Sequence, residues 1–285
     1  MCIWKLITCI LYTFLCYIKF NGGSFLKKEI TKNKNFVFIV YLILRLFVIM
    51  AMISQIFLKN WNNVFLCILT LMLYLIPDIL DRKFNIELPS VLEVTILLFI
   101  FASFILGEIS YFYKAFPYWD IILHTINGFI CAGIGFSLVD ILNRNEKIHI
   151  KLTSTFVALV AFCFSMTIGV LWEFYEYGVD KFTNHDMQKD SIVTEIKSVT
   201  LNKKGQNIPE KIENIKFTKV YTYNNGELNE TIIEGGYLDI GINDTMQDLI
   251  VNFIGAFVFS IYGFLYIKNR DKYKFTENFI PRIRK

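Results

Sequence analysis

The chain has 285 residues, of which 54% are hydrophobic and 28 are phenylalanine, and its mean hydropathy is +0.46. These values lie far outside those of a soluble domain and indicate a polytopic membrane protein. The formal net charge is only +4, so we expect membrane lipids rather than nucleic acid as partners. The six cysteines lie in apolar runs without a C-x-x-C pair, and we interpret them as small hydrophobic residues.

Hydrophobic runs predict about seven membrane-spanning helices, because a helix of about 20 apolar residues crosses a bilayer. The first run is short, and a cleaved signal peptide is its alternative, but no small-residue cleavage site follows it. The second run holds Arg45 as a candidate structural counter-charge, and Pro77 ends the third. The predicted spans cover residues 2–20, 36–58, 61–76, 89–113, 119–142, 152–177 and 244–266.

Basic residues gather in the linkers after the first, third and fifth spans and in the tail after the seventh. These four stretches lie on one side of the membrane if the spans alternate, and the positive-inside rule makes that side the cytoplasm. The N-terminus then lies outside and the C-terminus in the cytoplasm. The chain divides into a first span with a basic linker, spans two to six, an external hydrophilic insert, the last span and a basic tail: residues 1–35, 36–180, 181–240, 241–268 and 269–285.

The external insert contains segments that do not resemble membrane spans. Residues 191–201 and 215–223 are rich in β-branched and aromatic side chains, and Asn224-Asn225-Gly226 supplies turn chemistry before the next such run. We therefore predict a small β-hairpin insert on an otherwise all-α bundle. A solvated loop without activity is the alternative.

Polar side chains gather at the end of the fourth span, the start of the fifth, the end of the sixth and the start of the seventh. Because consecutive helices alternate in direction, these clusters fall at the same face of the membrane. Unpaired carboxylates at this density require a cation, shared protons or a positively charged ligand. The clustered residues are Glu108, Asp120, His124, Glu173, Glu176, Asp180, Asp244, Asp248 and Asn252.

Spacing places several of these side chains on shared helical faces. Asp120 and His124 stand one turn apart, and residues 244, 248 and 252 stack over roughly 12 Å of one face. Oxygen ligands suit Mg²⁺, Mn²⁺ or Ca²⁺, and Zn²⁺ if His124 binds, although a lone histidine is more often a hydrogen-bonded core residue. We predict a divalent-cation site whose ligands are Asp120, His124, Glu173, Glu176, Asp244 and Asp248. Further candidates for polar residues at this site are Glu108, Asp180 and Asn252.

Local explanations exist for some of these residues. Asp120 and Asp244 can cap the helices that they open, and Glu108 and Asp180 can be solvated at the membrane interface. Three of the other residues lie a turn or more inside apolar sequence, where polar groups are costly, and they favour a functional site: Glu173, Asp248 and Asn252.

Four motifs together carry a resemblance to a known family. They are Gly107-Glu108, Trp119-Asp120 with His124 and Gly128, Trp172-Glu173-Phe174-Tyr175-Glu176-Tyr177, and the series from Gly236 to Ala256. From about residue 77 the chain resembles the YjdF-type family of uncharacterised bacterial inner-membrane proteins. The D-x-x-x-H and D-x-x-x-N-x-x-G patterns also resemble, more weakly, VanZ-like membrane proteins linked to glycopeptide tolerance. The resemblance implies a multi-pass protein of the bacterial cell membrane, and the YjdF-type family carries no settled activity.

Two functions of different classes follow. The first is an enzyme that acts at the outer leaflet on a lipid or cell-envelope precursor, with a metal that activates water or polarises a phosphoryl oxygen. The alternative is a cation- or proton-coupled transporter or ion-binding membrane protein; a factor that binds or assembles envelope components is a less specific third. The sequence contains no Ser or Cys nucleophile motif, P-loop or dinucleotide fingerprint.

Overall fold

The computed structural model describes residues 34–84, 86–143 and 152–283. The predicted first span and nearly all of its basic linker lie outside these residues. Within the described ranges, six helices are long and apolar enough to cross a membrane. The helical elements are α2 (Lys34–Phe57), α3 (Trp61–Leu73), α4 (Ile76–Phe84), α5 (Ser90–Ile100), the π-helix η1 (Phe101–Ile109), α6 (Phe112–Ala115), α7 (Trp119–Asn143), α8 (Ser154–Phe182) and α9 (Ile242–Lys268). The predicted polytopic helical bundle is confirmed.

Several boundaries differ from those expected from the sequence. The fourth predicted span ends at Ile109 rather than at residue 113, and α6 follows it as a separate short helix. Pro77 does not end the third span: α3 stops at Leu73, and α4 starts at Ile76 with Pro77 in its first turn. A proline is tolerated there because the first N–H groups of a helix have no intrahelical acceptor. The two helices together form the apolar segment Trp61–Lys83. In addition, α8 continues to Phe182, so its last turn carries Asp180.

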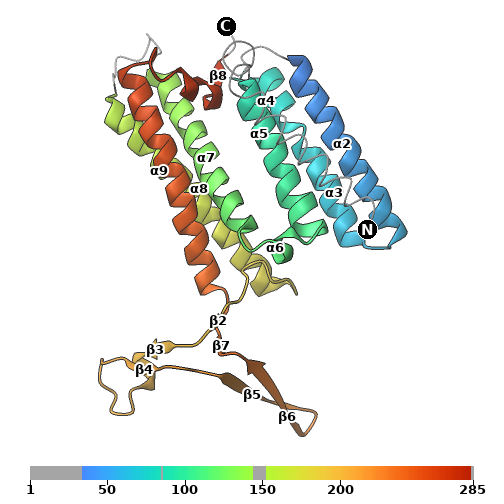
Figure 1. Ribbon diagram of the computed structural model, residues 1–285, viewed down its shortest axis with the longest axis vertical. Coiled ribbons are helices and arrows are strands. Elements are labelled where there is room, and N and C mark those ends of the chain that lie inside the picture. The colour runs from blue at the N-terminus through green and yellow to red at the C-terminus, as the bar shows by residue number, and fades with distance from the viewer. Residues whose placement is uncertain (1–33, 85, 144–151, 284–285) are drawn as a thin grey trace.

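The helices form two groups (Figure 1). The first group contains α2, α3 and α5 with η1; the second contains α7, α8 and α9, which pack closely on one another. Gly128 and Gly255 permit this approach, as their small size predicts. A Cβ atom at Gly128 would lie 2.2 Å from the backbone oxygen of Asn252, and one at Gly255 would lie 2.0 Å from that of Thr125. In the first group, the Arg45 guanidinium lies over the Tyr41 ring, 4.1 Å from its centroid.

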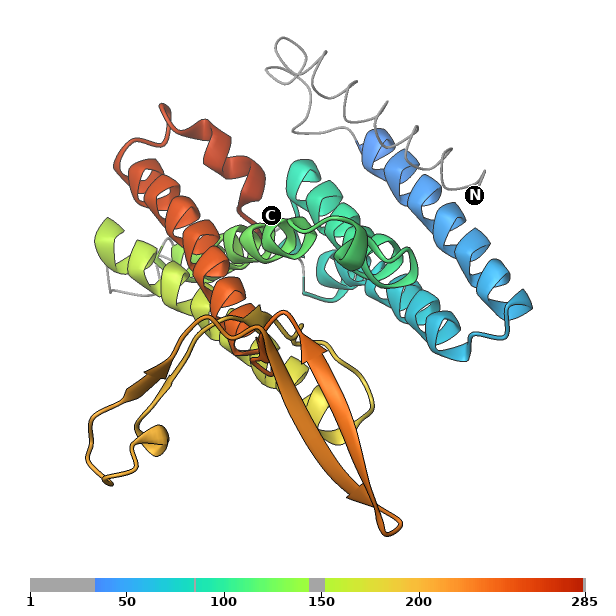
Figure 2. The ribbon, with the colours of Figure 1, turned by 60° about the horizontal axis from the view of Figure 1, so that its bottom comes forward.

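The polar insert between α8 and α9 forms antiparallel strand pairs that project from one end of the bundle (Figures 1 and 2). Strands β5 (Phe217–Asn224) and β6 (Glu227–Glu234) form the predicted hairpin. Its turn residues Asn225 and Gly226 both have positive φ, as two-residue hairpin turns of type I′ require. The shorter strands are β2 (Ile192–Val193), β3 (Ile196–Ser198), β4 (Glu210–Ile212) and β7 (Tyr237–Leu238), and a 3₁₀ turn, η2, covers Val199–Leu201.

The predicted strand at residues 191–201 is divided between two pairings. Strand β2 pairs with β7 next to the bundle, whereas β3 pairs with β4 farther out. The β2–β7 pair therefore joins the two ends of the insert at its base. We call this end of the bundle the insert side.

The C-terminal segment crosses the opposite side of the bundle. It forms a 3₁₀ helix, η3 (Lys274–Phe279), and a short strand, β8 (Arg282–Ile283), which pairs with β1 (Ile86–Glu87) of the first helix group. The Ser137 hydroxyl on α7 donates to the Pro281 carbonyl over 2.6 Å. The predicted basic tail is thus packed against both helix groups.

Candidate functional site

The candidate site lies on the insert side, where the first turns of α7 and α9 meet the last turns of α8 (Figure 1). His124 stands among three carboxylates that come from these three helices. Its Nε2 lies 3.4 Å from Asp120 Oδ1 and 3.6 Å from Asp248 Oδ2, and its Nδ1 lies 3.9 Å from Glu173 Oε1. These separations exceed those of good hydrogen bonds, so the imidazole is surrounded by acids without being firmly bound to any of them.

Two groups of three side chains are close enough to hold a metal ion. One consists of Asp120, His124 and Asp248, the other of Glu173, Glu176 and Asp248; in each, one ligand atom per residue lies within 4.8 Å of the others. Asp248 belongs to both groups. We call these five residues the acidic cluster.

Asp248 and Glu173 are the most enclosed carboxylates of the acidic cluster. Their side chains are 1% and 5% exposed, and among the described residues neither carboxylate oxygen of either group has a hydrogen-bond partner. Glu176 differs, because its Oε1 accepts from Trp172 Nε1 over 2.8 Å. Burying an ionised carboxylate without a partner costs several kcal/mol, so Asp248 and Glu173 each need a proton or a cation.

Asn252 lies one turn deeper on α9, where it links the three helices. Its Oδ1 accepts from Asn127 on α7 over 3.5 Å, and its Nδ2 lies 3.5 Å from the Ser165 carbonyl on α8. It is 1% exposed.

Two of the predicted acids hold the segment that leads from α8 into the insert. Asp244 Oδ2 accepts from the backbone N–H of Lys189 over 2.8 Å. The two oxygens of Asp180 accept from the backbone N–H groups of Met187 and Gln188 over 2.6 and 2.8 Å. Asp180 is therefore an anchor for this segment, and Asp244 has a backbone partner that the buried cluster carboxylates lack.

The capping explanation for Asp244 is wrong, because the residue before the first turn of α9 is Gly241. Asp239 serves the start of α9 instead: it accepts from the backbone N–H of Asn243 over 3.0 Å and of Ser191 over 2.7 Å. Although desolvation of the carboxylate opposes ionisation, these hydrogen bonds lower the pKa of Asp239. Glu108 is exposed at the end of η1 and outside the acidic cluster.

Sequence reasoning overlooked Tyr113, which follows η1 on the insert side. Its ring packs on Gly107, where an added Cβ would lie 2.4 Å from the ring. Desolvation, followed by repulsion from the neighbouring carboxylates of Asp120, Glu108, Glu176 and Asp248, raises the pKa of the Tyr113 phenol. The phenol therefore stays an O–H donor beside the acids. The only sequence signal was an aromatic residue at the end of the fourth predicted span.

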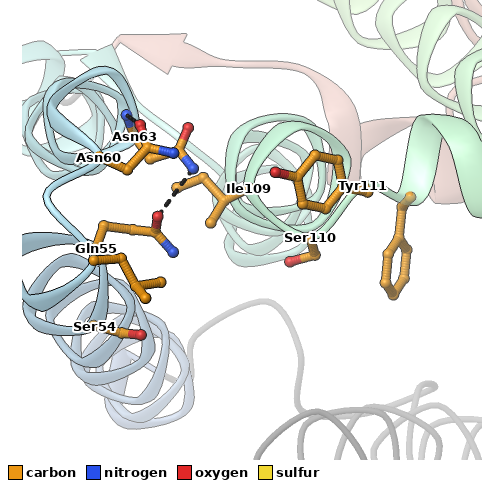
Figure 3. A pocket seen from close by; sticks show the side chains of 9 residues that line it. Ser54, Gln55, Asn60, Asn63, Ile109, Ser110 and Tyr111 are labelled. Atoms are coloured by element: carbon orange, nitrogen blue, oxygen red, sulfur yellow. Dashed lines mark hydrogen bonds between the residues drawn. The ribbon is translucent and has the colours of Figure 1, made fainter. Parts of the chain in front are cut away.

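A cleft of about 480 Å³ opens elsewhere on the insert side, between the α2–α3 turn and the end of η1 (Figure 3). Two side-chain amides face each other across part of it, and Asn63 Nδ2 donates to Gln55 Oε1 over 3.1 Å. None of the nine lining residues belongs to the acidic cluster. Besides those two, the polar lining residues are Ser54, Asn60, Ser110 and Tyr111.

A family model described as "Predicted membrane protein (DUF2238)" matches residues 37–269, a range that includes the acidic cluster. No curated protein and no solved structure matches the chain.

Proposed function

The chain belongs to the DUF2238 family of predicted membrane proteins, which is the YjdF-type family that its motifs resemble, and we propose that its acidic cluster binds a divalent cation. The comparisons give no support to the weaker resemblance to VanZ-like proteins. The function that we propose for the protein is that of a membrane-embedded metalloenzyme, which acts on a lipid or cell-envelope substrate at the outer leaflet.

The observation that carries this proposal is the pair of buried carboxylates without hydrogen-bond partners, Asp248 and Glu173, on either side of His124. A buried carboxylate that served only the fold would have a donor, as Asp140 on the opposite side has in Arg270 Nη2 at 3.0 Å. Carboxylate oxygens with one imidazole nitrogen form a ligand set for Mn²⁺, Mg²⁺ or Zn²⁺.

The chemistry of such a site suits phosphate-bearing substrates. A bound divalent cation polarises a phosphoryl oxygen or lowers the pKa of a bound water, which then acts as a nucleophile. In our proposal the Tyr113 phenol donates a hydrogen bond to the substrate near the cation. The position at the ends of the spanning helices favours lipid head groups over substrates held deep in the bilayer.

Cation or proton transport is the second candidate, and a line of polar side chains favours it. One turn deeper in the bundle than Asp248, Asn252 contacts Asn127. The Oδ1 atom of Asn127 in turn accepts from Cys131 Sγ over 3.5 Å. This line leads from the acidic cluster toward the middle of α7. Proteoliposomes distinguish the two candidates: a transporter moves Mn²⁺ or protons across a lipid bilayer without any substrate, whereas the enzyme does not.

The test of cation binding compares the full-length protein in detergent with its Asp248→Asn variant, which keeps the shape of the side chain and removes the charge. In a chelator, the variant should unfold at a higher temperature than the wild type, because repulsion within the cluster is reduced. With Mn²⁺ present the order should reverse, since linkage stabilises the wild type by about 2.7 kcal/mol at a concentration of ~100 times the dissociation constant.

The matched control is Asp140→Asn, which changes a buried carboxylate on the opposite side and keeps an acceptor for Arg270. This variant should respond to Mn²⁺ as the wild type does. The series is repeated with Mg²⁺, Ca²⁺ and Zn²⁺. Equal and flat responses of the wild type and Asp248→Asn to all four ions would end the cation-binding proposal.

A further inference from the structure

We infer that the acidic cluster holds two divalent cations that share Asp248 as a bridging ligand. This inference rests on the proposed function and extends it from one cation to a pair. The first cation is bound by Asp120, His124 and Asp248, and the second by Glu173, Glu176 and Asp248.

The placement of the ligand atoms supports a division into two sites. Both groups have the spacing that metal binding needs, and the residue that they share has two buried oxygens without partners. Asp248 Oδ2 faces His124 Nε2 at 3.6 Å, which leaves Oδ1 for the second group. A carboxylate can therefore bridge two ions with one oxygen on each.

The orientation of His124 fits the same division. Its Nε2 lies on the side of Asp120 and Asp248, whereas its Nδ1 lies 3.9 Å from Glu173 Oε1 on the side of the second group. With Nε2 bound to the first cation, Nδ1–H points toward a ligand of the second. Hydrogen bonds of this kind, from a metal-bound histidine to a carboxylate, fix the ring in many metal sites.

Charge gives an independent reason for two ions. The cluster contains four carboxylates, from Asp120, Glu173, Glu176 and Asp248, and three of them are buried. Fully ionised, they carry four negative charges, which two divalent cations neutralise. With a single divalent cation, two of the carboxylates would have to bind protons, because uncompensated charge is costly at the edge of the bilayer.

A pair of cations also narrows the class of substrate. Two divalent ions about 3.5–4 Å apart chelate the oxygens of one phosphate group and stabilise both the attacking and the leaving oxygen in its displacement. The site would therefore take a phosphate or diphosphate ester. The Asp248 bridge is the part of the site that sets the distance between the two ions.

The test counts Mn²⁺ bound to the full-length protein in detergent, by equilibrium dialysis with metal analysis, and compares it with single-site variants. The wild type should bind two Mn²⁺ ions. His124→Ala and Glu176→Gln should each bind one, because each removes a ligand of a different site, and Asp140→Asn should still bind two. Elution as a single species in size-exclusion chromatography establishes that each variant is folded; if His124→Ala fails this, His124→Gln replaces it.

Electron paramagnetic resonance of the Mn²⁺-loaded protein gives a second measurement. Two ions that share a carboxylate are magnetically coupled, so the wild type should show a coupled spectrum and each single-site variant the spectrum of an isolated ion. One ion per wild-type chain would overturn the paired site but leave the proposed cation binding intact. No bound ion would overturn both.

Discussion

Asp248 and Asn252 occupy the same face of α9, one turn apart, yet their surroundings differ. Asn252 has hydrogen-bond partners on both neighbouring helices, whereas the two oxygens of Asp248 have no hydrogen-bond partner among the described residues. The amide is satisfied because Gly128 and Gly169 let the helices approach it; a Cβ at Gly169 would lie 2.6 Å from Asn252 Nδ2. These glycines therefore set the depth at which α9 sits against its neighbours, and with it the position of Asp248.

A prediction at this scale concerns Gly255 on α9. Gly255→Ala places a methyl group 2.0 Å from the Thr125 carbonyl and forces α7 and α9 apart. We expect a loss of ~1–3 kcal/mol of stability, typical of overpacking, together with weaker Mn²⁺ binding. Thermal unfolding with and without Mn²⁺ measures both effects.

The control for this substitution is Gly178→Ala on α8, where nothing lies within 4 Å of the added Cβ. Alanine is favoured over glycine inside a helix by up to about 1 kcal/mol, so this variant should be as stable as the wild type or more so. If Gly255→Ala behaved in the same way, close packing of α7 and α9 would not hold the site together.

Among the elements of the fold, the insert and the bundle are connected by carboxylate side chains that accept backbone hydrogen bonds, rather than by an apolar core. Asp180, Asp239 and Asp244 accept backbone N–H groups from the segment 187–191 and from the start of α9. The hairpin β5–β6 projects beyond this base and exposes large side chains, including Tyr221 and Tyr223. Because the anchors lie on the bundle side of β2 and β7, we expect the acidic cluster to keep its shape without the outer strands.

We therefore predict that the bundle folds without the outer strands. Replacing residues 195–234 by an Asn-Gly turn keeps the β2–β7 pair and removes β3 to β6. The shortened protein should elute as the same species in detergent, melt at nearly the same temperature and keep its response to Mn²⁺. Its aggregation or complete loss of the Mn²⁺ response would show that the outer strands are part of the bundle's structure.

At the scale of the whole molecule, two helix groups are joined on the side opposite the insert. Strand β8 pairs with β1 of the first group, while the Pro281 carbonyl accepts from Ser137 of the second. On this side, Arg270 contacts both Asp140 at 3.0 Å and the hydroxyl of Tyr266 at 3.3 Å. The basic end of the chain is thus held by specific contacts on the side opposite the insert.

The last prediction concerns orientation. Basic residues on the side opposite the insert include Arg82, Lys83, Lys268 and Arg270, and under the positive-inside rule we predict that this side faces the cytoplasm. A reporter that is active only outside the cytoplasm should be silent when fused to the C-terminus. Protease added to spheroplasts should cut the insert, and cleavage only in inverted vesicles would reverse the orientation.

The class of protein, most helix positions and the hairpin turn could be predicted from the sequence, because run length, helical spacing and Asn-Gly turn chemistry act over short stretches of chain. Alternation of the spans was also enough to gather the acids at one end. The differences in burial and hydrogen bonding among those acids became visible only in the folded chain. Asp180 and Asp244 accept backbone N–H groups from the insert, while Asp248 and Glu173 are enclosed without donors. Burial and hydrogen bonding depend on residues that are far apart in the chain, so they cannot be predicted from local sequence patterns.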